Sequence, residues 1–214
     1  MTKKNNLNEY ASAEYALRYL SRADSIPHRT EGEATLLEFI PQTVQRILDL
    51  GSGDGRLLAL LRIEHQDAEG IALDFSPTMI KIARERFSND PKVQVIEHNL
   101  NNPLPDLGKF DVIVSSFAIH HCSDDRKRQL YFEIFDALSP GSVFCNLEHV
   151  ASSTVELHSR FIRSLGLNES DEDPSNKLLD VETQLLWLRD IGFQNVDCYW
   201  KWLELALFGG NKIK

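Results

Sequence analysis

The sequence predicts an α/β fold, a three-layer sandwich around a mostly parallel sheet of seven strands with an antiparallel last strand. Short apolar runs alternate with segments of helical periodicity, as in parallel sheets with crossover helices. A glycine-rich turn follows the first apolar run (Gly51, Gly53 and Gly55). The link between the last two runs, 193–202 and 203–210, is so short that these strands must pair antiparallel.

Length and composition indicate one globular domain, residues 1–214, with 42% hydrophobic and 26% charged residues. The net charge of −9 gives no sign of the basic face that nucleic acid binding requires, so no nucleic acid partner is expected. No stretch resembles a signal peptide or a membrane span, so we expect a cytoplasmic protein without membrane contact. The scattered cysteines fit neither a disulfide framework nor a zinc site, and no metal is expected (Cys122, Cys145 and Cys198).

The glycine turn is predicted to cradle a ligand between the strand 46–50 and the helix that continues through 57–61. Glycines let the backbone turn sharply, and the helix that follows points free N–H groups into the turn. The pattern Gly-x-Gly-x-Gly is not the phosphate-binding Gly-x-Gly-x-x-Gly, and the Lys-Ser/Thr of a P-loop is missing. Asp49 and Asp54 would repel a pyrophosphate and favour a ligand with positive charge or hydroxyl donors.

A second strand, 69–74, ends in Asp74. This residue stands about twenty residues beyond the glycine turn, where an acidic side chain accepts ribose hydroxyls in this kind of fold. Ser76 is a plausible N-cap of the following helix, and Pro77 suits its first turn.

Residues 48–55 (Leu-Asp-Leu-Gly-Ser-Gly-Asp-Gly) resemble the first motif of class I S-adenosylmethionine-dependent methyltransferases, and the resemblance extends from about Tyr15 to the C-terminus. It implies a Rossmann-like fold, S-adenosylmethionine as cofactor and S-adenosylhomocysteine as product. It also implies cofactor contacts from the turn (Asp49, Gly51, Ser52 and Gly53). The resemblance is specific for the cofactor and uninformative about the acceptor. A glycine turn of another nucleotide-binding fold is the alternative.

The resemblance implies further cofactor-binding residues. The family shares the Ser-Pro-x-Met pattern that follows Phe75, with the methionine near the adenine, although Met79 could equally be ordinary core. Many members carry an aspartate near Asn99; here the amide oxygen can still accept the adenine amino group, and the N–H of Leu100 could serve the ring. Arg29 could pair with the cofactor's carboxylate, or it could be an exposed loop arginine.

The fourth predicted strand, 110–116, ends in Ser115 and Ser116. Ligands of open parallel sheets sit beyond the carboxyl ends of the strands, so both serines are expected in the cofactor site.

The segment after this strand resembles the family's Ala-Leu-His-His stretch and contributes His120 and His121. Either imidazole could be a general base near neutral pH, or both could be structural, one capping the strand and one packing on the cofactor. Glu148 ends the fifth strand, 143–148, and is a second candidate for contacting the acceptor.

Two accessory segments complete the prediction. Helices over 9–20 and 31–40 form an N-terminal extension (1–40) that either covers the substrate pocket or packs on the domain surface. A variable insert (151–180) contains an acidic stretch that is either a solvated loop or a lid. Residues 139–141 are expected to form a turn.

We therefore expect a monomeric or homodimeric methyltransferase that acts on a small-molecule acceptor. Two alternatives stay open. One is an enzyme of transfer RNA modification that forms carboxy-S-adenosylmethionine, although the extra arginines which that family needs cannot be placed here. The other is a module that binds S-adenosylmethionine without transferring its methyl group.

Overall fold

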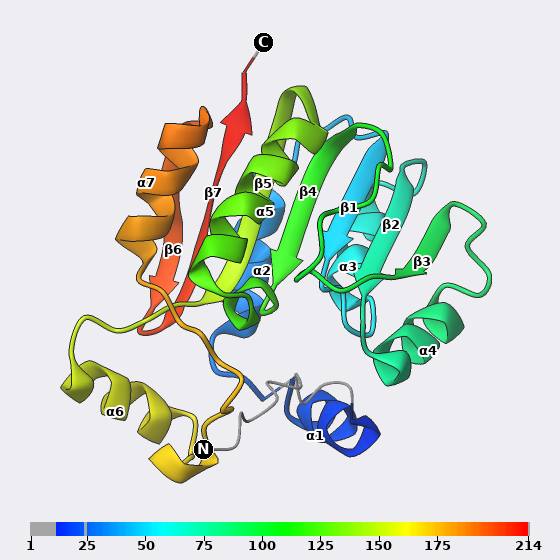
Figure 1. Cartoon of the computed structure of the whole chain (residues 1–214). Helices are drawn as coiled ribbons and strands as arrows, with labels where there is room; N and C mark the ends of the chain where they lie inside the picture. The colour runs from blue at the N-terminus through cyan, green and yellow to red at the C-terminus, as the bar shows by residue number, and fades with distance from the viewer. Residues whose placement is uncertain (1–11, 24, 214) are drawn as a thin grey trace.

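The computed structural model describes residues 12–23 and 25–213, and its centre is one sheet of seven strands (Figure 1). The strand order is β3-β2-β1-β4-β5-β7-β6. Strands β1 to β5 pair in parallel, and β7 is antiparallel to both of its neighbours, which confirms the predicted fold class. The strands are β1 (Arg46–Leu50), β2 (Glu69–Asp74), β3 (Val93–Glu97), β4 (Phe110–Ser116), β5 (Leu138–His149), β6 (Gln194–Trp202) and β7 (Leu205–Lys212).

Helices cover both faces of the sheet (Figure 1). On one face, α2 (Arg29–Glu38) and α3 (Arg56–Glu64) bury leucines against the strands, among them Leu36 and Leu58. On the other face, α5 (Asp124–Ala137) and α7 (Val181–Ile191) bury residues such as Leu130 and Leu188. Two separate apolar cores therefore hold the three layers together, because each strand alternates its side chains between the faces.

Three elements border the carboxyl ends of the parallel strands. Helices α1 (Ala13–Ala23) and α6 (Val155–Ser164) lie beyond these ends (Figure 1), and α4 (Pro77–Arg86) follows β2 directly. Among the described residues, two short 3-10 helices, η2 (Ile119–His121) and η3 (Glu169–Asp171), belong to the segments after β4 and α6. The edge where ligands bind in parallel sheets is thus enclosed by helices.

The N-terminal extension differs from the prediction in its second helix. The expected helix start near Glu9 lies outside the described residues. Helix α2 begins at Arg29 and packs on the sheet face, so α1 is the part of the described extension that lies over the carboxyl edge.

The predicted turn at 139–141 is part of a strand instead. Strand β5 starts at Leu138, which pairs with Phe110, and its register against β4 then shifts before Val143 pairs with Val112. The extra residues form an exposed irregularity in which Gly141 has a φ of 88°, a conformation that favours glycine. No helix in the described ranges has the length and apolar character needed to cross a membrane.

Candidate active site

The glycines of the turn after β1 serve different purposes. All three adopt positive φ angles, 64° at Gly51, 55° at Gly53 and 80° at Gly55. A Cβ atom on Gly51 would lie 2.2 Å from the Cβ of Ala118, so only glycine lets the turn approach the segment after β4. A Cβ on Gly53 would meet only the sulfur of Met79, at 4.0 Å. The turn is therefore tightly packed at its base and open at Gly53.

Asp74 fixes this turn and the next helix together. Its Oδ2 accepts the N–H of Gly53 and its Oδ1 accepts the N–H of Ser76, both at 2.8 Å. Ser76 is the N-cap residue of α4, as predicted, but its hydroxyl makes no capping bond, and the Asp74 carboxylate accepts its N–H instead. Burial raises the pKa of Asp74, and the backbone donors oppose that rise. Each oxygen keeps a further lone pair for a ligand.

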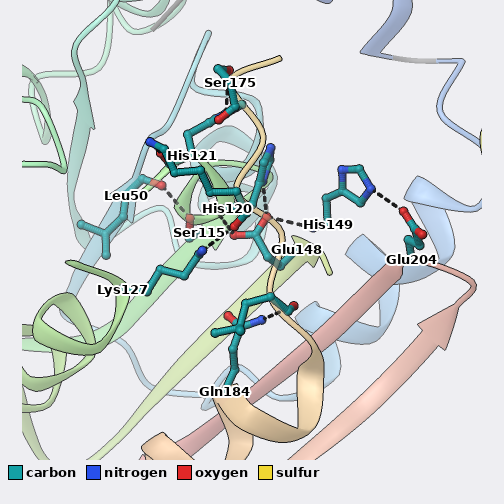
Figure 2. Close-up of polar contacts among 12 residues, drawn as sticks. Leu50, Ser115, His120, His121, Lys127, Glu148, His149, Ser175, Gln184 and Glu204 are labelled. Atoms are coloured by element: carbon teal, nitrogen blue, oxygen red, sulfur yellow. Dashed lines mark hydrogen bonds and ion pairs between the residues drawn. The ribbon is translucent and has the colours of Figure 1, made fainter. Parts of the chain in front are cut away.

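A cavity of about 650 Å³ opens beside this turn. The predicted cofactor-binding residues line it with the exception of Ser115 (Arg29, Asp49, Gly51, Ser52, Gly53, Asp74, Phe75, Met79, Asn99, Leu100 and Ser116). The Ser115 hydroxyl is fully buried and donates to the carbonyl of Leu50 at 2.8 Å, which ties β4 to β1 (Figure 2). The side chain of Ser115 therefore does not face this cavity, and the prediction was wrong in that respect.

The wall of this first cavity presents acceptors and donors that the protein leaves unused. Asp49 is 1% exposed; its Oδ2 accepts the N–H of Leu58 at 3.2 Å, and its Oδ1 has no hydrogen-bond partner. The hydroxyls of Ser52 and Ser116 are likewise buried without a partner. Burial raises the pKa of Asp49 to about 7. Such atoms suit a ligand with ammonium or hydroxyl donors.

Two charged side chains of the first cavity differ from the sequence-based expectation. Asp54 forms an ion pair with Arg86, so its charge is partly compensated. Arg29 is not an exposed loop residue: it is the first residue of α2, it is 6% exposed, and its Nε donates to Glu33 at 2.8 Å. Its guanidinium also lies 5.4 Å from the centre of the Phe117 ring.

His120 and Glu148 form a buried pair (Figure 2). The Nδ1 of His120 lies 2.5 Å from Oε1 of Glu148, and the main-chain N–H of His120 donates to Oε2 at 3.0 Å. The main-chain N–H of His149 also donates to Oε1, at 2.8 Å. Glu148 is 1% exposed and lines neither cavity, which corrects the expectation that it contacts an acceptor directly. It orients His120 instead.

The protonation of this pair follows from its surroundings. Burial raises the pKa of Glu148 to about 7 and lowers the pKa of His120 well below its usual value. A neutral His120 donates its Nδ1 hydrogen to Glu148, which leaves Nε2 as a hydrogen-bond acceptor. Unlike His120, His121 lines the first cavity. Burial lowers the pKa of His121 as well, to about 3.

A second cavity of about 400 Å³ lies on the other side of Phe117 and Tyr19, the two residues that line both cavities. His120 and His149 are on its wall, together with residues of α1, α6 and the insert. The φ of Phe117 is 52°, an unusual conformation for a bulky side chain that costs about 1–2 kcal/mol. Nothing in the sequence but its place after the fourth strand pointed to Phe117.

A chain of histidines and glutamates reaches the wall of the second cavity through His149 and Glu172, and the sequence did not predict it. His149 Nε2 lies 2.9 Å from Glu204 Oε2, and His158 Nδ1 lies 3.0 Å from Glu204 Oε1. His158 Nε2 continues to Glu172 at 3.4 Å. Burial lowers the pKa of His158, but its bonds to Glu204 and Glu172 outweigh burial and raise it. The chain connects β5, α6, the insert and the β6–β7 link.

Comparison with known proteins places this architecture. A methyltransferase domain model matches residues 47–141. The chain is 30% identical over 183 residues to the demethylmenaquinone methyltransferase of Clavibacter sepedonicus, covering 77% of this chain and 71% of that protein. It is 25% identical over 193 residues to the carboxy-S-adenosyl-L-methionine synthase of Cronobacter sakazakii, covering 81% and 76%.

Solved structures show the same fold. Human N-acetylserotonin methyltransferase, solved in complex with SAM, superposes with a TM-score of 0.71 at 16% identity, covering 100% of this chain and 61% of that chain. An O-methyltransferase family protein from Burkholderia thailandensis superposes with a TM-score of 0.66 at 16% identity, covering 100% and 74%. The chain matches a named methyltransferase over most of its length, and it shares the fold of these enzymes. It therefore belongs to the class I S-adenosylmethionine-dependent methyltransferases.

Proposed function

We propose that the chain transfers a methyl group from S-adenosylmethionine in the first cavity to a small-molecule acceptor in the second, with His120 as general base. The observation that carries the proposal is the pair of adjoining cavities, which meet at Tyr19 and Phe117, with the His120–Glu148 pair on one side. A homodimer or monomer in the cytoplasm, without a nucleic acid substrate, belongs to the same proposal.

The residues of the first cavity fit this cofactor. The buried Oδ1 of Asp49 and the hydroxyl of Ser52 lack partners, which suits a ligand with a cationic amine and hydroxyl groups. In our proposal Asp74 accepts the ribose hydroxyls, and Arg29 binds the carboxylate as a fixed guanidinium. Met79 and Leu100 provide the apolar surface for adenine.

The cofactor supplies, when bound, a methyl group that its sulfonium already activates, so the protein mainly aligns the acceptor and excludes water. His120 takes the acceptor's proton on Nε2. Glu148 holds the imidazole in the correct tautomer and stabilises the positive charge that the ring gains. Phe117 and Tyr19 then border the place where the two ligands meet.

The alternative that the chain makes carboxy-S-adenosylmethionine has support from the relative of that name, but the cavity argues against it. A second bound carboxylate needs cations, whereas the described wall of the second cavity carries three carboxylates and a single arginine, Arg18 (Asp171, Glu172 and Asp173).

Titration calorimetry with S-adenosylhomocysteine, followed by a methyl-release assay over a metabolite pool, tests the proposal. We expect binding, turnover on a low-molecular-weight acceptor, and a loss of turnover without loss of binding in His120→Ala. Binding without turnover on any pool would favour the non-catalytic module, and failure to bind would reject the proposal altogether.

A further inference from the structure

The second cavity is built from segments that are distant in the sequence. Helix α1 contributes Tyr15 and Tyr19, the segment before α2 contributes Ile26, and α6 contributes Phe161 and Ile162. The volume of about 400 Å³ is at the small end of the range for small-molecule sites. It accommodates an acceptor with one or two rings and not a folded macromolecule.

Apolar side chains cover the part of this cavity that faces α6. Phe161 is 1% exposed and Ile162 is 3% exposed, and both pack with Leu205 in one small core. The aromatic ring of Phe161 also lies 5.0 Å from the ring of His149. A ligand body placed here loses its water and contacts mainly carbon atoms, so it has to be apolar itself.

The polar end of the cavity is formed by two imidazoles. The rings of His120 and His149 lie 5.6 Å apart, edge to face, and each ring is held by a buried glutamate, Glu148 and Glu204 respectively. Because these bonds fix the rings, the acceptor's reacting group has a defined place beside Nε2 of His120.

The charges on the wall have one dominant sign. Asp171, Glu172 and Asp173 line the cavity from the insert. Burial raises the pKa of Asp173, but hydrogen bonds from Ser175 and from the hydroxyl of Tyr15 together outweigh this effect and lower the pKa, so the group is ionised. Glu172 is paired with His158. Arg18 lies over the ring of Tyr15, 4.8 Å from its centre.

We propose that the second cavity selects acceptors that have an apolar body and a neutral or cationic proton-donating group, and that it rejects acceptors that carry a carboxylate or phosphate. The inference rests on the proposed function, because it assigns this cavity to the acceptor. An anion that binds here loses its hydration and meets a wall of like charge, so its binding is unfavourable. A hydroxyl group, by contrast, makes a hydrogen bond to His120.

The test uses two probes with one body, 2-naphthol and 2-naphthoate, titrated at pH 7.5 into protein saturated with S-adenosylhomocysteine. We expect the Kd of 2-naphthol to be at least tenfold lower. The double variant Glu172→Gln, Asp173→Asn should reduce the ratio of the two Kd values, 2-naphthoate over 2-naphthol, to less than threefold. The matched double variant Glu182→Gln, Asp190→Asn, on the exposed side of α7, should leave it unchanged.

Phe161→Trp locates the binding: it should weaken 2-naphthol at least tenfold and leave the Kd of S-adenosylhomocysteine within twofold, which also shows that the variant folds. Equal affinity for the two probes, or failure of 2-naphthol to bind a protein that binds S-adenosylhomocysteine, would overturn the acceptor class alone. Failure to bind S-adenosylhomocysteine would instead refute the proposed function on which it rests.

Discussion

Replacing Asp74 by asparagine should weaken cofactor binding through the loss of charge at two acceptor oxygens. A hydrogen bond to a charged group contributes about 1.5–3 kcal/mol, and one between neutral groups about 0.5–1.5 kcal/mol. If each of two ribose hydroxyl bonds weakens by about 1 kcal/mol, the Kd of S-adenosylhomocysteine rises about 30-fold. Asparagine also turns an NH₂ group toward the N–H of Gly53 or Ser76, which should lower the unfolding free energy by about 1–3 kcal/mol.

Asp111 provides the matched control. Its Oδ2 accepts the N–H groups of Gln45 and Arg46, at 2.8 and 2.9 Å, at the start of β4 and outside both cavities. Asp111→Asn therefore removes the charge of a carboxylate that also binds main-chain donors. Titration calorimetry should give an unchanged Kd for this variant, and urea denaturation measures the stability of both. A Kd within threefold of wild type in Asp74→Asn would refute the ribose role of Asp74.

Three further predictions concern the buried groups. Glu148→Gln should lower kcat about 10- to 100-fold with little change in the Kd of S-adenosylhomocysteine, and an unaltered kcat would remove the positioning role. Burial raises the pKa of Asp49 to about 7, so its contribution to stability is full below about pH 4 and is lost as the pH rises through 7. Urea denaturation between pH 4 and 8 should therefore show a decline in unfolding free energy that is about 3–4 kcal/mol smaller in Asp49→Asn than in wild type. Parallel pH dependences of wild type and variant would contradict this. Phe117→Gly should be about 1 kcal/mol more stable than Phe117→Ala because the φ is 52°, and the opposite order would argue against backbone strain.

The elements with local signals were predictable from the sequence. Strands β1, β2 and β4 have the predicted bounds, since each is an apolar run bordered by turn residues. The start of β5 was not predictable, because residue Leu138 becomes a strand residue only by pairing with Phe110. Boundaries decided by a distant partner leave no local pattern.

The same distinction holds for the site. The glycine turn and Asp74 were found because their spacing along the chain is itself the signal. Glu148 was predicted as a candidate for contacting the acceptor, but its partner is 28 positions away, and only the fold shows that it orients His120. Glu204 lies 55 positions from His149, and no spacing rule connects them.

The placement of β7 has a consequence for biosynthesis. β7 is the last strand along the chain, but it lies between β5 and β6, and β6 pairs with no other strand in the described sheet. During synthesis, β6 therefore has no strand to pair with until β7 has been made, and the edge of β5 is also unpaired. Unpaired strand edges favour aggregation. Glu204 precedes β7 and holds His149 on the wall of the second cavity, so that wall is completed in the same late step. A nascent chain that already contains the glycine turn and Asp74 thus still lacks a complete second cavity.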